Sequence, residues 1–296
     1  MAVIDIVSPA LFSLLLWWSS TAAILWLDRM RPSSFPWSML GATVALAIGL
    51  RGLAWSSADS TSSGAYCAFT CAVLAWGWQE TAFLLGYMTG PRRTGCRPGC
   101  GGVEHFRHGV EAVLYHELAL LAGAIAVVWL TWGGVNQVGT WTFLTLWALR
   151  LSAKLNLFLG VPNSGAELLP AHLRYLECFF STRAMNLLFP FSITAATVLA
   201  TRLWWQALAA PAGSGSATGA TLLATLACLA LLEHWLMVLP LRSSAPWSWP
   251  LGLGELASST AAAAPSQDPP IRPLHADGNV PIGLQAVGAQ AKAITA

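Results

Sequence analysis

Runs of about twenty mostly apolar residues recur along the first 245 residues, and no other feature constrains the fold of this chain as strongly. A helix needs about 20 such residues to cross the roughly 30 Å hydrocarbon core of a bilayer. Only 9% of the residues are charged, whereas a soluble domain carries about 25%. The sequence therefore predicts an all-α bundle of about seven membrane-spanning helices. The predicted spans cover residues 10–27, 37–55, 66–89, 112–132, 138–160, 187–208 and 219–241.

The basic residues of the connecting loops predict how the chain is oriented. Loops that contain arginine alternate along the chain with loops that contain no lysine or arginine. The first set lies near 28–36, 90–111 and 161–186, and the second near 56–65, 133–137 and 209–218. Because loops rich in lysine and arginine stay in the cytoplasm, we expect a cytoplasmic C-terminus and an N-terminus outside. Residues 1–27 lack the basic start of a signal peptide, so we expect a retained first span.

Two further segments differ from the spans. Residues 166–180 interleave apolar and charged side chains in a pattern that predicts an amphipathic helix at the cytoplasmic membrane interface. Residues 246–296 are rich in alanine and proline without periodicity, which predicts a disordered tail. The expected organisation is therefore a transmembrane domain over residues 1–245, followed by a cytoplasmic tail over residues 246–296.

Several ionisable side chains lie inside the apolar runs, and the predicted orientation puts them in the cytoplasmic half of the bilayer. A charge at the bilayer centre costs at least about 2.5–3.5 kcal/mol on insertion scales, so such groups normally face the bundle interior and have partners. We expect this polar layer to carry the function. Its members are Glu80, His116, Glu117, Arg150, Lys154, Glu233 and His234.

The polar layer is open to three interpretations. It can be a structural ion-pair network, because buried pairs lock helices into one arrangement. It can bind a tetrapyrrole, either through a chlorophyll-type magnesium or as a haem, with His116 and His234 as the best-placed axial ligands. It can also form a proton or substrate pathway, as intramembrane carboxylates and histidines do in transporters, although the chain lacks a transporter's inverted repeat.

A transition-metal site is a further alternative. Glu104, His108, Glu111 and Tyr115 are spaced by four, three and four residues, which puts them on one face of a helix. Carboxylate and imidazole ligands from bundled helices suit a buried di-iron or similar site. His108, Glu111 and His116 are the predicted ligands, although the repeated ExxH pairs of di-iron bundles are absent.

The cysteines do not follow the disulfide pattern of a small secreted protein. Cys96 and Cys100 share one loop, but three intervening residues suit neither the usual zinc knuckle nor the thioredoxin motif. An ordinary loop pair and a metal or redox role therefore both stay open for them. Cys178 stands alone in the sequence and indicates nothing by itself.

Three neighbouring segments resemble the photosynthetic complex assembly protein 2 family, whose members are called PuhE. They are Ser152-Ala-Lys-Leu-Asn-Leu-Phe-Leu-Gly-Val-Pro-Asn163, Leu168-Leu-Pro-Ala-His-Leu-Arg-Tyr-Leu176 and Met185-Asn-Leu-Leu-Phe-Pro190. Tyr115-His-Glu-Leu-Ala119 and Thr89-Gly-Pro-Arg-Arg93 fit the same family. Members of this family are encoded near the reaction-centre H subunit in purple phototrophic bacteria.

The resemblance implies a protein of the bacterial inner (intracytoplasmic) membrane that acts in photosynthetic complex assembly or in bacteriochlorophyll supply. Its expected partners are the lipid bilayer and reaction-centre or light-harvesting subunits. His172 and Arg174, near the interface, can bind a propionate or a lipid phosphate, because arginine makes bidentate contacts with anions. An ordinary interface anchor is the alternative for Arg174.

We therefore expect an integral membrane assembly factor for the photosynthetic complex, which handles bacteriochlorophyll or a precursor, rather than an enzyme. A membrane metalloenzyme of tetrapyrrole metabolism, with buried glutamate and histidine ligands, is the first alternative. A small permease is the second. The net charge of +2 and the lack of a basic run argue against a nucleic-acid partner.

Overall fold

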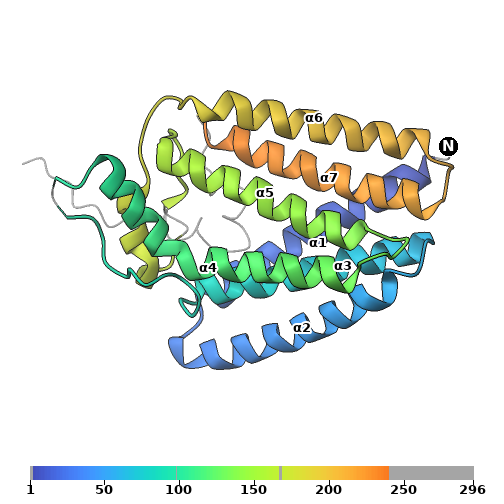
Figure 1. The fold of residues 1–296 in the computed structure, drawn as a ribbon, viewed down its shortest axis with the longest axis horizontal. Helices are drawn as coiled ribbons and strands as arrows, with labels where there is room; N and C mark the ends of the chain where they lie inside the picture. The colour runs from blue at the N-terminus through green and yellow to red at the C-terminus, as the bar shows by residue number, and fades with distance from the viewer. Residues whose placement is uncertain (1–2, 98, 167–168, 240–296) are drawn as a thin grey trace, which may run out of the picture. The chain divides into compact units, whose positions relative to one another are not determined.

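A computed structural model describes residues 3–97, 99–166 and 169–239, and this part of the chain folds into seven long α-helices without a strand (Figure 1). The all-α prediction is therefore confirmed. The predicted tail over residues 246–296 lies outside the described residues. The helices are α1 Ile4–Leu27, α2 Phe35–Ser56, α3 Ser62–Leu84, α4 Gly102–Leu130, α5 Val138–Leu159, α6 Leu188–Ala209 and α7 Gly215–Leu236, with 3-10 helices η1 Pro32–Ser34 and η3 Ala171–Phe179.

Four segments are both long enough and apolar enough to cross a membrane. They are Ile4–Leu27, Pro32–Ser56, Gly102–Leu130 and Gly215–Leu236. The other three long helices do not belong to this set, and two of them contain charged residues of the polar layer: Glu80 in α3, and Arg150 and Lys154 in α5. A membrane protein is supported, and the count of seven spans stays a prediction.

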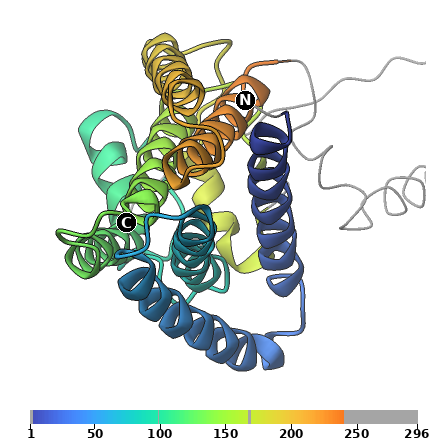
Figure 2. The same ribbon diagram turned by 90° about the vertical axis from the view of Figure 1, so that its right-hand side faces the viewer.

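Small residues allow several helices to approach α3 closely. α3 packs against α1, α2, α4, α5 and α7, and Figure 2 shows these helices around it in a view close to the helix axes. A methyl group on Gly49 of α2 would lie only 2.8 Å from the carbonyl oxygen of Cys71. Small residues at such crossings are the usual basis of helix packing in membranes.

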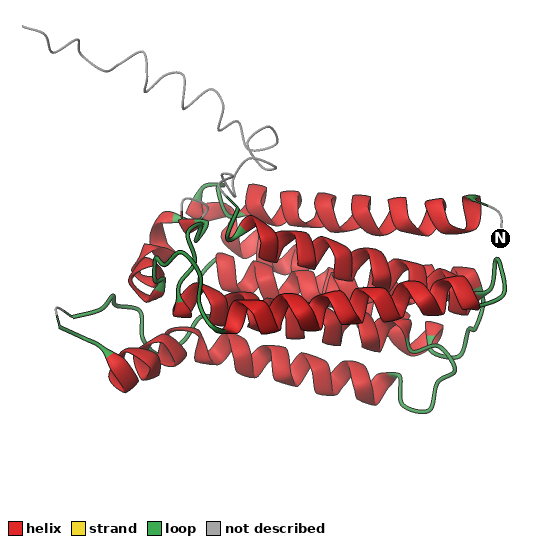
Figure 3. Ribbon diagram, turned by 90° about the horizontal axis from the view of Figure 1, so that it is seen from above, coloured by secondary structure: helices red, strands yellow, loops and turns green. Residues whose placement is uncertain are grey.

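The interfacial segment differs from the expected α-helix. Residues 171–179 form a 3-10 helix, and its buried side chains are Leu173, Leu176 and Phe179. A 3-10 helix has 3.0 residues per turn, so this spacing of three puts all three side chains on one face. They pack against Phe83 and Ala112 at the end of the bundle where the longer loops gather (Figure 3).

The segment after α3 lies directly against the backbone of α4. Thr89 O accepts a hydrogen bond of 2.9 Å from the backbone N–H of His116, and Glu111 O accepts one of 3.4 Å from that of Arg92. Gly90 lies between them, and a Cβ atom there would be 2.6 Å from the carbonyl carbon of Ala112. Helices bend where another group inserts into their hydrogen-bond ladder, and Figure 1 shows the first turns of α4 leaving the axis of the rest.

Candidate functional site

Two ion pairs connect three helices in the polar layer. Arg150 Nη2 of α5 lies 3.2 Å from Glu80 Oε2 of α3, and Lys154 Nζ of α5 lies 2.6 Å from Glu117 Oε1 of α4. Arg150 and Lys154 are four residues apart, so they project from the same face of α5. Trp147 of that helix also donates from Nε1 to Glu117 Oε2 at 3.5 Å. The structure therefore brings both cations and two of the three carboxylates together.

His116 is enclosed at the centre of this group. Its side chain is fully buried, its Nε2 lies 4.0 Å from Glu80 Oε1, and its ring centroid lies 4.5 Å from that of Phe83. Among the described residues, neither ring nitrogen of His116 has a hydrogen-bond partner, and neither does Glu80 Oε1. An imidazole and a carboxylate with free lone pairs at this separation can share a proton or bind a cation.

The layer reaches the surface of the bundle at Arg150. The Arg150 side chain is 44% exposed, whereas that of Glu80 is 10% exposed. Lys154 is 23% exposed and lies over the Phe83 ring at 5.8 Å from its centroid. The guanidinium of Arg150 is thus bound by the buried carboxylate of Glu80, while part of the Arg150 side chain stays exposed at the bundle surface.

The two residues contributed by α7 occupy different positions. Glu233 is close enough to Arg150 to interact with it electrostatically. His234 is buried and lies 3.0 Å from Ser152 Oγ through Nε2 and 2.8 Å from Ala230 O through Nδ1. Because both ring nitrogens of His234 have partners, this arrangement leaves it no free lone pair for a metal or a pigment.

The predicted metal ligands of α4 have separate partners. Glu111 pairs with Arg107 Nε at 3.5 Å, and His108 lies beside Glu104. His108 and His116 are eight residues apart, which is about 12 Å along a helix. A single ion binds its ligand atoms at about 2 Å, so these residues do not meet at one point in this conformation.

The interfacial residues His172 and Arg174 face different surroundings. His172 Nε2 lies 2.8 Å from Leu84 O at the end of α3. His172 also lines a cavity of about 330 Å³ together with Thr89, Arg93 and Tyr175. Arg174 is exposed on η3. Within the cavity, the guanidinium of Arg93, the imidazole of His172 and the two hydroxyl groups are suited to binding an anionic group.

The asparagines of the family-like segments form joints between helices. Asn156 Nδ2 donates to Ser152 O and to Ser192 Oγ of α6, each at 2.9 Å. Asn186 Nδ2 donates to Asn156 O at 3.2 Å, and Asn163 Nδ2 donates to Leu236 O of α7 at 3.0 Å. These segments therefore connect the end of α5 to α6 and α7.

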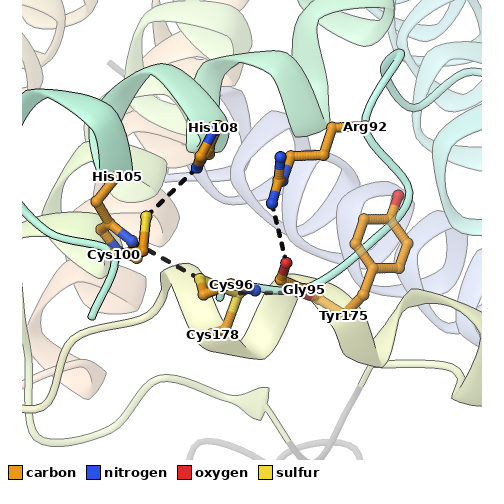
Figure 4. The surroundings of a disulfide bond; sticks show 8 residues. All are labelled: Arg92, Gly95, Cys96, Cys100, His105, His108, Tyr175 and Cys178. Atoms are coloured by element: carbon orange, nitrogen blue, oxygen red, sulfur yellow. Dashed lines mark hydrogen bonds between the residues drawn. A yellow bond between two sulfur atoms is a disulfide. The ribbon is translucent and has the colours of Figure 1, made fainter. Parts of the chain in front are cut away.

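Sequence reasoning missed a cysteine and histidine cluster at the start of α4 (Figure 4). Cys96 and Cys178 form a disulfide, with Cα atoms 5.8 Å apart and a sequence separation of 82. His105 Nδ1 lies 3.7 Å from Cys96 Sγ, and His108 Nδ1 lies 3.3 Å from Cys100 Sγ. The sequence signals were the shared loop of Cys96 and Cys100 and the predicted metal ligand His108, but disulfide connectivity cannot be read from spacing alone.

The chain is similar to known proteins over all of its described helices. A family model described as "Protein of unknown function (DUF3623)" matches residues 3–257. A Rhodobacter capsulatus protein, described as an uncharacterized 30.4 kDa protein in the puhA 5′ region, is 42% identical over 257 residues, which are 86% of this chain and 93% of that protein. No solved structure matches the chain.

Proposed function

The chain belongs to the family described as a protein of unknown function (DUF3623), and we propose that it is an integral membrane factor for assembly of the bacterial photosynthetic reaction-centre or light-harvesting complex. Its sequence resembles the PuhE family, and its R. capsulatus relative is named for a position in the puhA 5′ region. The proposal includes the bacterial inner (intracytoplasmic) membrane, with the N-terminus outside and the C-terminus in the cytoplasm.

The observation that carries this proposal is the exposure of Arg150 inside α5. Its side chain is 44% exposed, although it lies well within a helix expected to span the membrane. A charge that faces lipid at this depth is unfavourable, so a polar group of a partner would cover it. Glu80 holds the guanidinium in one orientation, which favours recognition of a defined group on a photosynthetic subunit.

The pigment-handling part of the proposal rests on an apolar cavity between the helices that carry Glu80, Glu117 and Arg150 and their neighbour α2. A cavity of about 260 Å³, with an almost wholly apolar lining, lies between α2, α3, α4 and α5. Gln79, the neighbour of Glu80, is its polar lining residue, together with apolar residues such as Leu50, Trp78 and Phe143. Such a cavity accepts a hydrocarbon chain like the tail of bacteriochlorophyll or its precursor.

Co-purification tests the assembly function. The full-length tagged chain is expressed in a phototrophic bacterium in place of its own copy and purified in mild detergent. We expect reaction-centre or light-harvesting subunits to co-purify, and we expect Arg150→Leu to reduce them about fivefold or more, because a central interface arginine contributes above about 1 kcal/mol. An absorption spectrum of the same sample tests for bound pigment.

Arg51→Leu is the matched control, because Arg51 is also an exposed arginine inside a long apolar helix, α2. It should leave the co-purified subunits unchanged. A wild-type chain that captures no subunit would overturn the proposal. Equal losses in both variants would remove the role assigned to Arg150.

A metalloenzyme of tetrapyrrole metabolism is the second candidate, and the unpartnered nitrogens of His116 beside Glu80 favour it. This function requires a stoichiometric transition metal that disappears in His116→Ala. A protein that keeps its metal content in that variant would not be such an enzyme.

A further inference from the structure

A thiol, a carboxylate and an imidazole converge where the chain enters α4. Cys100 lies two residues before the helix, and Glu104 and His108 are four residues apart on its first turns. Cys100 Sγ is 3.3 Å from His108 Nδ1, and Glu104 Oε1 is 3.8 Å from His108 Nε2. One ligand atom from each of the three residues lies within 4.8 Å of the other two.

An ion takes only one ring nitrogen of His108, so the measure that applies to the whole cluster is the limit of 4.8 Å between its three ligand atoms. Zinc binds sulfur at about 2.3 Å and nitrogen or oxygen at about 2.0–2.2 Å, so tetrahedral ligand atoms are roughly 3.3–3.8 Å apart. From separations of up to 4.8 Å, side-chain rotations that bring the ligand atoms about 1–1.5 Å closer would let the cluster enclose an ion. The ligand types also discriminate between metals, since thiolate and imidazole select zinc and related transition metals over magnesium and calcium.

The surroundings favour binding at this place. The His108 side chain is 8% exposed, whereas that of Glu104 is 62% exposed, so a fixed inner ligand is combined with access from solvent. Arg107, the nearest arginine along the helix, pairs with Glu111 rather than with Glu104. The carboxylate of Glu104 is thus not neutralised by its neighbour.

We propose that Cys100, Glu104 and His108 bind one divalent transition-metal ion of the Zn²⁺ class, with water completing the coordination. The ion ties the loop before α4 to the first turns of that helix. The Cys96–Cys178 disulfide ties the same loop to η3, and Figure 4 shows this disulfide near Cys100 and His108. This site is separate from the polar layer, and the proposal does not rest on the assembly function.

Binding releases a proton, because the Cys100 thiol must become a thiolate to ligate the metal. His108 binds as the neutral imidazole, and Glu104 as the carboxylate. No electron transfer is involved. The affinity for the ion therefore falls as the pH is lowered.

Metal analysis of the full-length chain in detergent tests the site. The protein is loaded with Zn²⁺ without reductant, which keeps the Cys96–Cys178 disulfide closed, and free metal is then removed. We expect about one zinc per chain, because the three residues hold a single ion. Cys100→Ser and His108→Ala should each lose it. Cobalt loading gives a second measurement, since a thiolate–cobalt charge-transfer band should be present in the wild type and absent from Cys100→Ser.

His105→Ala and Cys67→Ser are the matched controls. His105 lies on the same first turns of α4, but its ring contacts Cys96, Phe158 and Phe179, and Cys67 is a free thiol in α3. Both variants should keep zinc and the cobalt band. Helical content, measured by circular dichroism, identifies any variant that has unfolded. If His108→Ala is unfolded, the loss of the cobalt band in folded Cys100→Ser tests the site instead. A wild type without retained zinc, or zinc kept in both ligand variants, would overturn the proposal.

Discussion

Lys154 Nζ lies 2.6 Å from Glu117 Oε1, in an ion pair that joins α5 to α4 and leaves the two side chains 23% and 24% exposed. Removing one partner leaves the other charge partly buried without compensation. The cost of that change exceeds the value of the pair itself. The pair therefore holds the two helices in one register more than it contributes net stability.

Glu117→Gln and Lys154→Met should each lower the free energy of unfolding by about 1–3 kcal/mol, a range between exposed and fully buried pairs. The double variant should lose less than the sum, because it leaves no lone charge. Denaturant unfolding in mixed micelles, followed by tryptophan fluorescence, measures all three. Strict additivity would show that the pair is not energetically coupled.

Asn156→Ala should destabilise the protein by about 1–3 kcal/mol, because Ser192 Oγ and Ser152 O lose their shared donor in a buried place. The same unfolding measurement applies. Ser38→Ala is the control, since the hydroxyl of Ser38 donates to Ser34 O one turn earlier, a bond that joins no second helix. Equal effects from the two substitutions would contradict the role of Asn156 as a joint between α5 and α6.

Gly90→Ala should be strongly destabilising, by more than about 3 kcal/mol, because the new methyl group would overlap the backbone of α4 at Glu111 and Ala112. Gly77→Ala is the matched control. A Cβ atom on Gly77 meets nothing within 4 Å, and alanine in a helix interior is favoured over glycine by about 0.5–1 kcal/mol. The two substitutions should therefore shift the melting temperature in opposite directions, and a tolerated Gly90→Ala would refute the close approach.

The redox state of Cys96 and Cys178 should report the side of the membrane. Both lie in segments that the arginine distribution assigns to the cytoplasm, where thiols are kept reduced. We expect rapid acid trapping of intact cells to find both as thiols, and the disulfide to form after purification in air. Alkylation and mass spectrometry measure this. Paired cysteines in freshly trapped cells would instead place these loops in the periplasm.

The purified, denatured protein provides the internal standard for that experiment. Its cysteines outside the disulfide are Cys67, Cys71, Cys100 and Cys228. They should bind four alkyl groups without reductant, and all six cysteines should react after reduction. Five or more groups before reduction would mean that Cys96 and Cys178 are not paired in the purified protein.

Local sequence patterns determined the helical architecture. Each long helix contains a mostly apolar run, and hydrogen bonding within a helix satisfies the backbone without help from distant residues. The span predicted over residues 112–132 nevertheless began too late, because α4 begins at Gly102. Polar residues such as Glu104 and His108 in its first turns concealed the helix from a hydropathy argument.

The sequence also determined which charges need partners, whereas only the tertiary structure decided the pairs. Glu80 and Arg150 are 70 residues apart, and nothing in their spacing favours this pairing over Glu80 with Lys154. The same holds for the Cys96–Cys178 disulfide and for the 3-10 helix that packs on α4. The physical reason is that a helix is stabilised by neighbours along the chain, while an ion pair or a disulfide depends on how packed helices are rotated and shifted against one another.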